Sequence, residues 1–113
     1  MLKKSIRIAK AKDWQTLYRR GRTVFGPGIV LKTLKSGSDI SRFGVVVGTK
    51  VSKRATIRNR LKRQIRAIIS QNYDKTRNGY DTIIITRPDL AKKAFAEIKN
   101  VLEESFKKAG LIS

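Results

Sequence analysis

The most regular hydrophobic pattern in the chain lies between residues 55 and 72. Four aliphatic residues there follow one another at intervals of four, four and three positions: Ile57, Leu61, Ile65 and Ile68. At about 100° per residue this spacing places them along one side of an α-helix, so the pattern predicts an amphipathic helix from Ala55 to Asn72. The rest of its circumference is basic, and we expect Arg58 and Arg60 to be exposed.

Two further helices are predicted near the ends of the chain. In residues 13–20 the apolar side chains have helical spacing, Asp13 stands at the favoured N-terminal end, and Gly21 is placed to end the helix. Residues 90–108 have a longer apolar face, which Gly110 closes; its members are Ala91, Ala94, Phe95, Ile98, Val101, Leu102, Ser105, Phe106 and Ala109.

Segments rich in β-branched and aromatic residues predict four strands, over residues 23–25, 29–34, 42–48 and 80–86. Gly26-Pro27-Gly28 interrupts the first two and suits a bulge or a turn. The resulting order, α-β-β-β-α-β-α, predicts an α/β (α+β) sandwich with a four-stranded sheet. No repeat or linker divides the chain, so we expect one domain over 1–113, with 1–10 flexible.

Composition restricts the function. The 113 residues include 27 Lys plus Arg and 8 Asp plus Glu, a formal net charge of +19, with no cysteine and no histidine. Disulfides, Cys-ligated zinc and the usual neutral-pH general base are therefore excluded. So high a charge suits a polyanionic partner, nucleic acid first and a membrane surface second. Aliphatic runs are far shorter than the ~20 residues of a membrane span, and we expect no secretory signal and a soluble, cytoplasmic protein.

The positive charge is concentrated in one window. No acid occurs from Ile40 to Tyr73, and nine cations do: Arg42, Lys50, Lys53, Arg54, Arg58, Arg60, Lys62, Arg63 and Arg66. Three of them repeat at intervals of four on the predicted helix, where like charges repel. A helix adapted only for solubility would mix signs. The window therefore favours a phosphate backbone as partner over a merely solvated surface, and arginine suits bidentate phosphate contacts.

Aromatic and glycine residues suggest a cleft beside this charge. Trp14 and Tyr18 lie one helical turn apart and could stack on single-stranded bases or fill the core; for Trp14 both interpretations stay open, and Tyr18 is expected to be partly exposed. Lys32 can project beside them or lie at the surface. Gly44 and Gly48 leave one sheet face bare for the close approach of a helix or a ligand. The acids are scattered, so no two-metal carboxylate site is predicted.

Residues 54–66 resemble the signature helix of the bacterial ribonuclease P protein subunit, with an Arg-Asn-Arg core at 58–60, an apolar residue, Lys-Arg and a further arginine. Residues 42–50 are similar to the family's strand before that helix, residues 13–21 to its aromatic first helix, and residues 80–88 to its last strand. The resemblance covers nearly the whole chain.

The resemblance implies a fold, ribosomal protein S5 domain 2-like, with a left-handed β-α-β crossover, an exception to the strong right-handed preference. It implies that a catalytic RNA performs the Mg²⁺-dependent hydrolysis that removes the 5′ leader of precursor tRNA, with Mg²⁺ held mainly by RNA. The protein would bind that RNA and the leader, as a monomer in a one-to-one complex, and would contribute no catalytic residue or metal site of its own.

The resemblance also implies site residues. Those that would bind RNA are Lys50, Lys53, Arg54, Arg58, Asn59, Arg60, Lys62, Arg63 and Arg66. Those of the leader cleft are Trp14, Tyr18, Val30 and Lys32. Lys32 stands where some relatives have tyrosine, which favours a phosphate contact over stacking there. Lys53 and Arg54 replace a Gly-Asn pair of other members and add charge.

Two other functions fit parts of the sequence. A ribosomal or other structural RNA-binding protein would have the same size and charge, and fold alone does not assign function. A stand-alone nuclease is the third hypothesis, and the missing histidine and the scattered acids oppose it.

Overall fold

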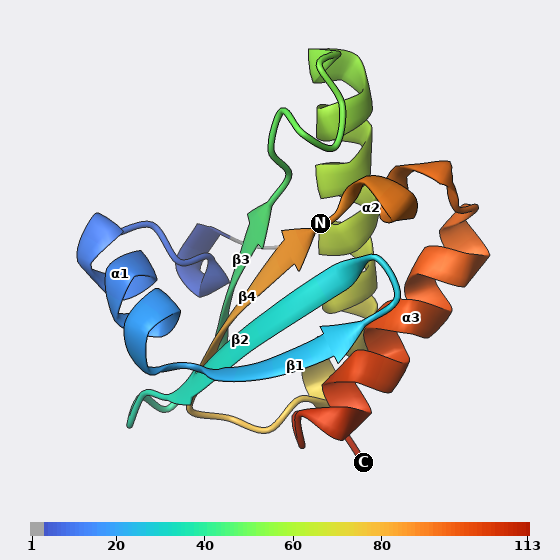
Figure 1. Cartoon of the computed structure of the whole chain (residues 1–113). Coiled ribbons are helices and arrows are strands. Elements are labelled where there is room, and N and C mark those ends of the chain that lie inside the picture. The colour runs from blue at the N-terminus through green and yellow to red at the C-terminus, as the bar shows by residue number, and fades with distance from the viewer. Residues whose placement is uncertain (1–3) are drawn as a thin grey trace.

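Four strands form one mixed sheet in the spatial order β1-β2-β4-β3 (Figure 1). β1 (Arg22–Gly26) and β2 (Ile29–Lys35) are an antiparallel hairpin. β4 (Tyr80–Thr86) pairs antiparallel with β2 and parallel with β3 (Arg42–Val46). This is a computed structural model, and it describes residues 4–113.

Helices cover both faces of the sheet. α1 (Ala11–Arg20) lies on one face, and α2 (Ala55–Asn72) and α3 (Phe95–Lys108) lie on the other (Figure 1). Three short 3-10 helices connect the larger elements: η1 (Lys4–Ile6), η2 (Tyr73–Lys75) and η3 (Pro88–Lys92).

The connection from β3 through α2 to β4 is left-handed. In Figure 1 both strands point upwards, α2 passes behind the sheet, and β4 lies to the right of β3. A right-handed crossover behind the sheet would place the second strand to the left. The structure therefore has the rare hand that the sequence resemblance implied.

The larger core lies between the sheet and the α2–α3 layer. The predicted stripe of α2 enters it at Leu61, Ile65 and Ile68, which are fully buried, whereas Ile57 is only half-buried. From the sheet, Phe43 joins the same cluster and contacts Phe106 of α3 in a tilted ring pair. α2 is thus anchored through its C-terminal two thirds, and its first turns carry little of the core.

A smaller cluster holds α1 against the opposite face. Trp14 donates its indole N–H to the carbonyl of Ile8 (3.2 Å), and its ring lies against Gly44. A Cβ at Gly44 would stand 2.4 Å from that ring, so the bare backbone of β3 is needed for the helix to approach. Gly48 has no atom within 4 Å of such a Cβ and serves no comparable contact.

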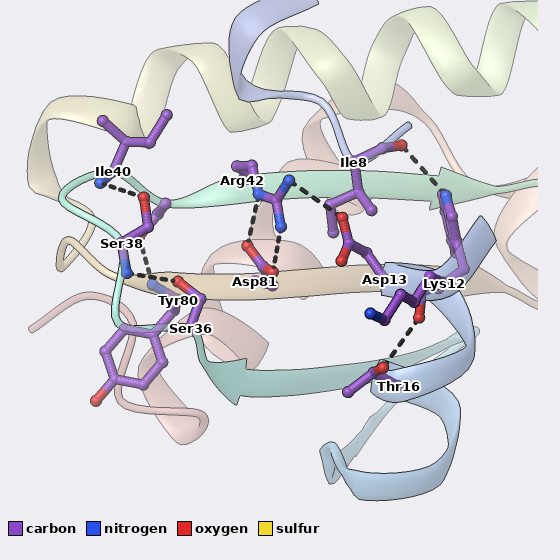
Figure 2. A network of polar contacts seen from close by, with 12 residues as sticks. Ile8, Lys12, Asp13, Thr16, Ser36, Ser38, Ile40, Arg42, Tyr80 and Asp81 are labelled. Atoms are coloured by element: carbon purple, nitrogen blue, oxygen red, sulfur yellow. Dashed lines mark hydrogen bonds and ion pairs between the residues drawn. The ribbon is translucent and has the colours of Figure 1, made fainter. Parts of the chain in front are cut away.

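An ion-pair network fixes the start of α1 to the sheet (Figure 2). Arg42 of β3 donates two hydrogen bonds to Asp81 of β4, at 3.0 and 2.7 Å, and one to Asp13 of α1 at 3.3 Å. The bonds to Asp81 raise the pKa of the Arg42 guanidinium above its ordinary value, although burial opposes the rise. One cation of the acid-free window is therefore committed to structure.

Some predicted boundaries differ from the structure. The helix predicted over 55–72 and the strand predicted over 80–86 are confirmed. β3 ends at Val46, two residues before the predicted end, and α1 begins at Ala11, two residues before the predicted start. The helix predicted from residue 90 is wrong over its first turn. Leu90 sits in a 3-10 turn against Gly28, where a Cβ would stand 3.1 Å from the Leu90 nitrogen, and extended backbone at 93–94 redirects the chain into α3.

The N-terminal segment also differs from expectation. Arg7 forms a parallel bridge with Phe43, and Ile8 is buried and donates its N–H to the Phe43 carbonyl at 2.9 Å. Residues 7 and 8 are thus attached to the sheet, in contrast to the flexible segment expected over 1–10. Residues 1–3 lie outside the described part of the chain.

Truncation of the α2 stripe tests the core. Leu61→Ala removes a fully buried side chain and is expected to lower the free energy of unfolding by about 2 to 5 kcal/mol. The exposed Gln71 on the same helix supplies the control, since Gln71→Ala should change it by less than about 0.5 kcal/mol. Urea unfolding monitored by circular dichroism measures both; equal losses would show that the helix faces are wrongly assigned.

The contact between Trp14 and Gly44 makes a second prediction. Gly44→Ala forces the indole ring away and should destabilise the protein by about 1 to 3 kcal/mol. Gly48→Ala meets no atom and should stay within about 0.5 kcal/mol of the parent. In a Trp14→Phe background, whose smaller ring leaves room, the Gly44→Ala penalty should shrink. An unchanged penalty would contradict the contact.

Candidate RNA-binding surface

The N-terminal part of α2 stands clear of the rest of the molecule. Figure 1 shows this end of the helix, with the loop that precedes it, extending beyond the sheet. Six helical residues, 55–60, come before the first buried position, Leu61. Side chains on several sides of this helix end are therefore accessible to a large ligand.

Nine predicted RNA-binding residues lie on this helix or the loop before it, and together we call them the basic surface. Six are exposed: Lys50, Lys53, Arg54, Asn59, Arg60 and Arg63. The other three are half-buried: Arg58, Lys62 and Arg66. The structure thus places all nine on α2 and the loop before it, with Lys62, Arg63 and Arg66 in the part of the helix that packs on the sheet.

Arg58 differs from its predicted exposed position. Its Nη1 donates a hydrogen bond of 2.9 Å to the carbonyl of Ser52, so the side chain braces the loop against the helix. Ser52 in turn accepts at its hydroxyl from the backbone N–H of Arg54 at 3.1 Å. The sequence pattern gave the correct helix but could not reveal this contact, because the loop conformation is set by tertiary structure.

Arg66 occupies a more confined place. It borders a hollow of about 80 Å³ together with Arg7, Trp14 and Gly44. Burial lowers the pKa of the Arg66 guanidinium below its ordinary value, and the positive charge of Arg7 lowers it further. Because arginine stays protonated in proteins, this lowering reflects a cation held at a cost, which a nearby phosphate would relieve.

Within the described residues 4–113, no acid side chain forms an ion pair with the basic surface. The ion pairs found among residues 4–113 join Arg42 to Asp13 and Asp81, and Lys107 to Glu104. None of them involves a residue of the basic surface. Its eight cations therefore add to a positive field that attracts and orients a polyanion.

A second surface lies on the sheet face that α1 only partly covers. Phe25, Val30, Ile85 and Val46 come from β1, β2, β4 and β3, and register places each beside the next across the sheet. None of the four is fully buried, and Phe25 is 66% exposed. We call these residues the open row.

Predicted leader-cleft residues meet at one end of this face. Lys32 follows Val30 by two positions on β2, and its Nζ donates to the carbonyl of Tyr18 (3.4 Å) and to the hydroxyl of Thr23 (3.2 Å). Tyr18 is 45% exposed, as expected. Trp14 instead packs on β3, so the structure favours its packing interpretation over a free stacking surface.

Sequence reasoning missed two parts of this face. The sequence predicted a strand over 23–25, but nothing in its pattern indicated that Phe25 would lie on a row that α1 leaves uncovered. A hollow of about 420 Å³ extends the open row at Val46 and Ile85, and Lys50 and Arg87 border it. No sequence signal marked this hollow, because it forms between two loops that are distant in the chain.

The described residues offer no fit for a protein-bound metal. Residues 4–113 contain no group of three or more acid side chains that could hold one. Asp13 and Asp81, which share Arg42, are both neutralised by it. In the same part of the chain, no helix has the length and apolar character needed to cross a membrane.

Comparisons with known proteins agree with one another. The family model for ribonuclease P matches residues 2–110. The ribonuclease P protein component of Synechocystis sp. is 38% identical over 112 residues, which cover 98% of this chain and 90% of the relative. That of Clostridium kluyveri is 36% identical over 107 residues, covering 93% and 95%.

Solved structures give the same result. RNase P protein from Staphylococcus aureus superimposes with a TM-score of 0.90 at 30% identity, covering 97% of this chain and 100% of that one. RNase P protein from Thermotoga maritima gives 0.83 at 29% identity, covering 90% and 96%. The matches extend over the basic helix, the left-handed crossover and the partly open sheet, and the chain belongs to the ribonuclease P protein family, as a protein subunit of that endoribonuclease.

Proposed function

We propose that the basic surface binds the catalytic RNA of ribonuclease P and that the open row, with Tyr18 and Lys32, binds the 5′ leader of precursor tRNA. The observation that most supports this proposal is that the cations at the projecting end of α2 form no ion pair with an acid among residues 4–113. A folded RNA can approach such an end from several sides. The open row, in contrast, suits a single strand, whose bases can lie on an apolar floor.

Charge neutralisation is the physical basis of the assistance. RNA strands that meet in a ribozyme–substrate complex repel each other, and Mg²⁺ or protein cations reduce that repulsion. We infer that Mg²⁺ is held mainly by RNA, since residues 4–113 bring no three acid side chains together and both Asp13 and Asp81 are paired with Arg42. The protein then lowers the Mg²⁺ concentration that the ribozyme requires, as a monomer bound to one RNA in the cytoplasm.

The leader would lie across the strands. Tyr18 offers an exposed ring at one side of the face, and the ammonium group of Lys32 lies at the Tyr18 backbone carbonyl, from where it can reach a phosphate. Stacking and phosphate contacts do not depend on base identity. Leaders of different sequence can therefore bind the same surface.

Family membership favours this function over a ribosomal or other structural RNA-binding role. Processing of precursor tRNA by bacterial ribonuclease P RNA at limiting Mg²⁺, with and without the protein, is the direct test. The protein should restore cleavage, and the assembled holoenzyme should bind precursor tRNA more tightly than mature tRNA. Equal affinity for both would support the structural role, and cleavage by the protein without RNA would support a nuclease.

A charge-matched pair of variants tests the basic surface. Arg60→Ala removes an exposed cation of α2, and Lys108→Ala removes one from the end of α3. Arg60→Ala should weaken assembly with the catalytic RNA by about 1 to 3 kcal/mol, as expected for a charged hydrogen bond, without a change in unfolding free energy. Lys108→Ala should have little effect on either. Equal weakening by both would mean that only total charge matters.

Salt dependence tests the leader contacts. If five or six phosphates of a single-stranded leader are contacted, the logarithm of the leader's contribution to binding should fall with the logarithm of salt concentration with a slope of about −4. The contribution is the ratio of affinities for precursor and mature tRNA, measured with the assembled holoenzyme. A flat response would contradict phosphate contacts to the leader.

A further inference from the structure

Phe25 is the most exposed large apolar side chain in the described part of the molecule. Its exposure is 66%, compared with 45% for Tyr18, 40% for Ile40 and 37% for Phe95. The neighbouring Val24 points into the α2–α3 core, so Phe25 points to the α1 face of the sheet. It belongs to neither core cluster, and folding alone gives no reason for an aromatic ring at this position.

The surroundings of Phe25 suit a nucleotide strand. Phe25 pairs in register with Val30 at one end of the open row, and Thr23 of the same face lies two positions, about 7 Å, along β1. The Thr23 hydroxyl accepts from Lys32, whose ammonium also reaches the Tyr18 carbonyl. The ammonium of Lys32 therefore lies between the end of α1 that carries Tyr18 and the strand that carries Phe25.

We propose that Phe25 is a further leader-binding residue, which stacks on a base of the single-stranded 5′ leader at the β1 edge of the sheet; this inference rests on the proposed function. Lys32 binds the phosphate next to that base. In this chain the stacking surface on the hairpin is then supplied by Phe25 of β1, while Lys32 of β2, which pairs in register with Thr23, supplies a cation on the same face.

A second copy of the chain is a weaker candidate for the same ring. β1 is an edge strand, and exposed edges can pair with one another. The strand has only five residues, however, and each copy carries a net charge of +19. Like charge of this size opposes self-association and favours an RNA strand.

The experiment uses holoenzyme assembled with bacterial ribonuclease P RNA. Phe25→Val keeps strand propensity and removes the ring, Phe25→Trp keeps a stacking surface, and Phe95→Ala is the control for an exposed ring on α3. Equilibrium affinities are measured for precursor tRNA, for mature tRNA, and for precursors with one abasic nucleotide at successive leader positions. Thermal unfolding of each free variant confirms that it folds.

Phe25→Val should weaken precursor binding by about tenfold, leave mature tRNA binding unchanged, and be reversed by Phe25→Trp. At one leader position, an abasic nucleotide should weaken binding of the precursor to the parent protein as much as Phe25→Val does. With that precursor the parent and Phe25→Val should bind equally well, since both changes delete the same stack. Phe95→Ala should behave as the parent at every position.

Two results would overturn the role of Phe25 and leave the proposed leader function standing. In the first, the parent prefers precursor tRNA and Phe25→Val binds it equally well. In the second, the affinity losses caused by Phe25→Val and by the abasic nucleotide are additive at every leader position. Dimers that dissociate on Phe25→Val, with leader affinity unchanged, would assign the ring to self-association instead. A parent with no preference for precursor over mature tRNA would overturn the proposed leader function itself, and the role of Phe25 with it.

Discussion

The contact between the Trp14 ring and the bare backbone of Gly44 determines how α1 lies on the sheet. Together with the Arg42 network, it holds the helix on the sheet at the end where β3 and β4 begin. The other end of the same face then remains accessible, with the open row across all four strands. A side chain at position 44 would push α1 away from the sheet. The boundary between the part of the face that α1 covers and the part that it leaves open would then be lost. A packing contact thus defines a binding surface that it does not itself form.

The positive charge of α2, unlike the packing of Trp14 on Gly44, lowers the stability of the free protein. Like charges repeat along the helix, and the half-buried Arg66 shares a hollow with Arg7. The free protein therefore carries an electrostatic cost in the region that we propose binds RNA. A ligand that binds the folded state offsets this cost and stabilises the fold by mass action. Arg42 is the exception within the acid-free window, because two aspartates neutralise it.

The long, strongly patterned elements were predictable. α2 and β4 have the predicted bounds because each combines a clear periodicity with adjacent turn residues. The last helix was predicted to start too early because Ala91 fits its apolar face, whereas residues 88–92 form a 3-10 helix with Leu90 buried against Gly28. For the site, the sequence alone located the cations, because the residue type by itself supplies the positive charge. It could not give the brace from Arg58 to the loop or the exposure of Phe25, because both depend on which elements meet in three dimensions.

The position of β4 in the sheet has a consequence for synthesis of the chain. β4 lies between β2 and β3, yet it is the last strand to leave the ribosome, after α2. Until residues 80–86 emerge, β2 and β3 have no strand between them, and their backbone groups are open to pairing with other chains. Residues 1–79 already contain most of the cations, so neighbouring nascent chains repel one another during that interval. The charge that we propose binds RNA thus also opposes aggregation of the unfinished sheet.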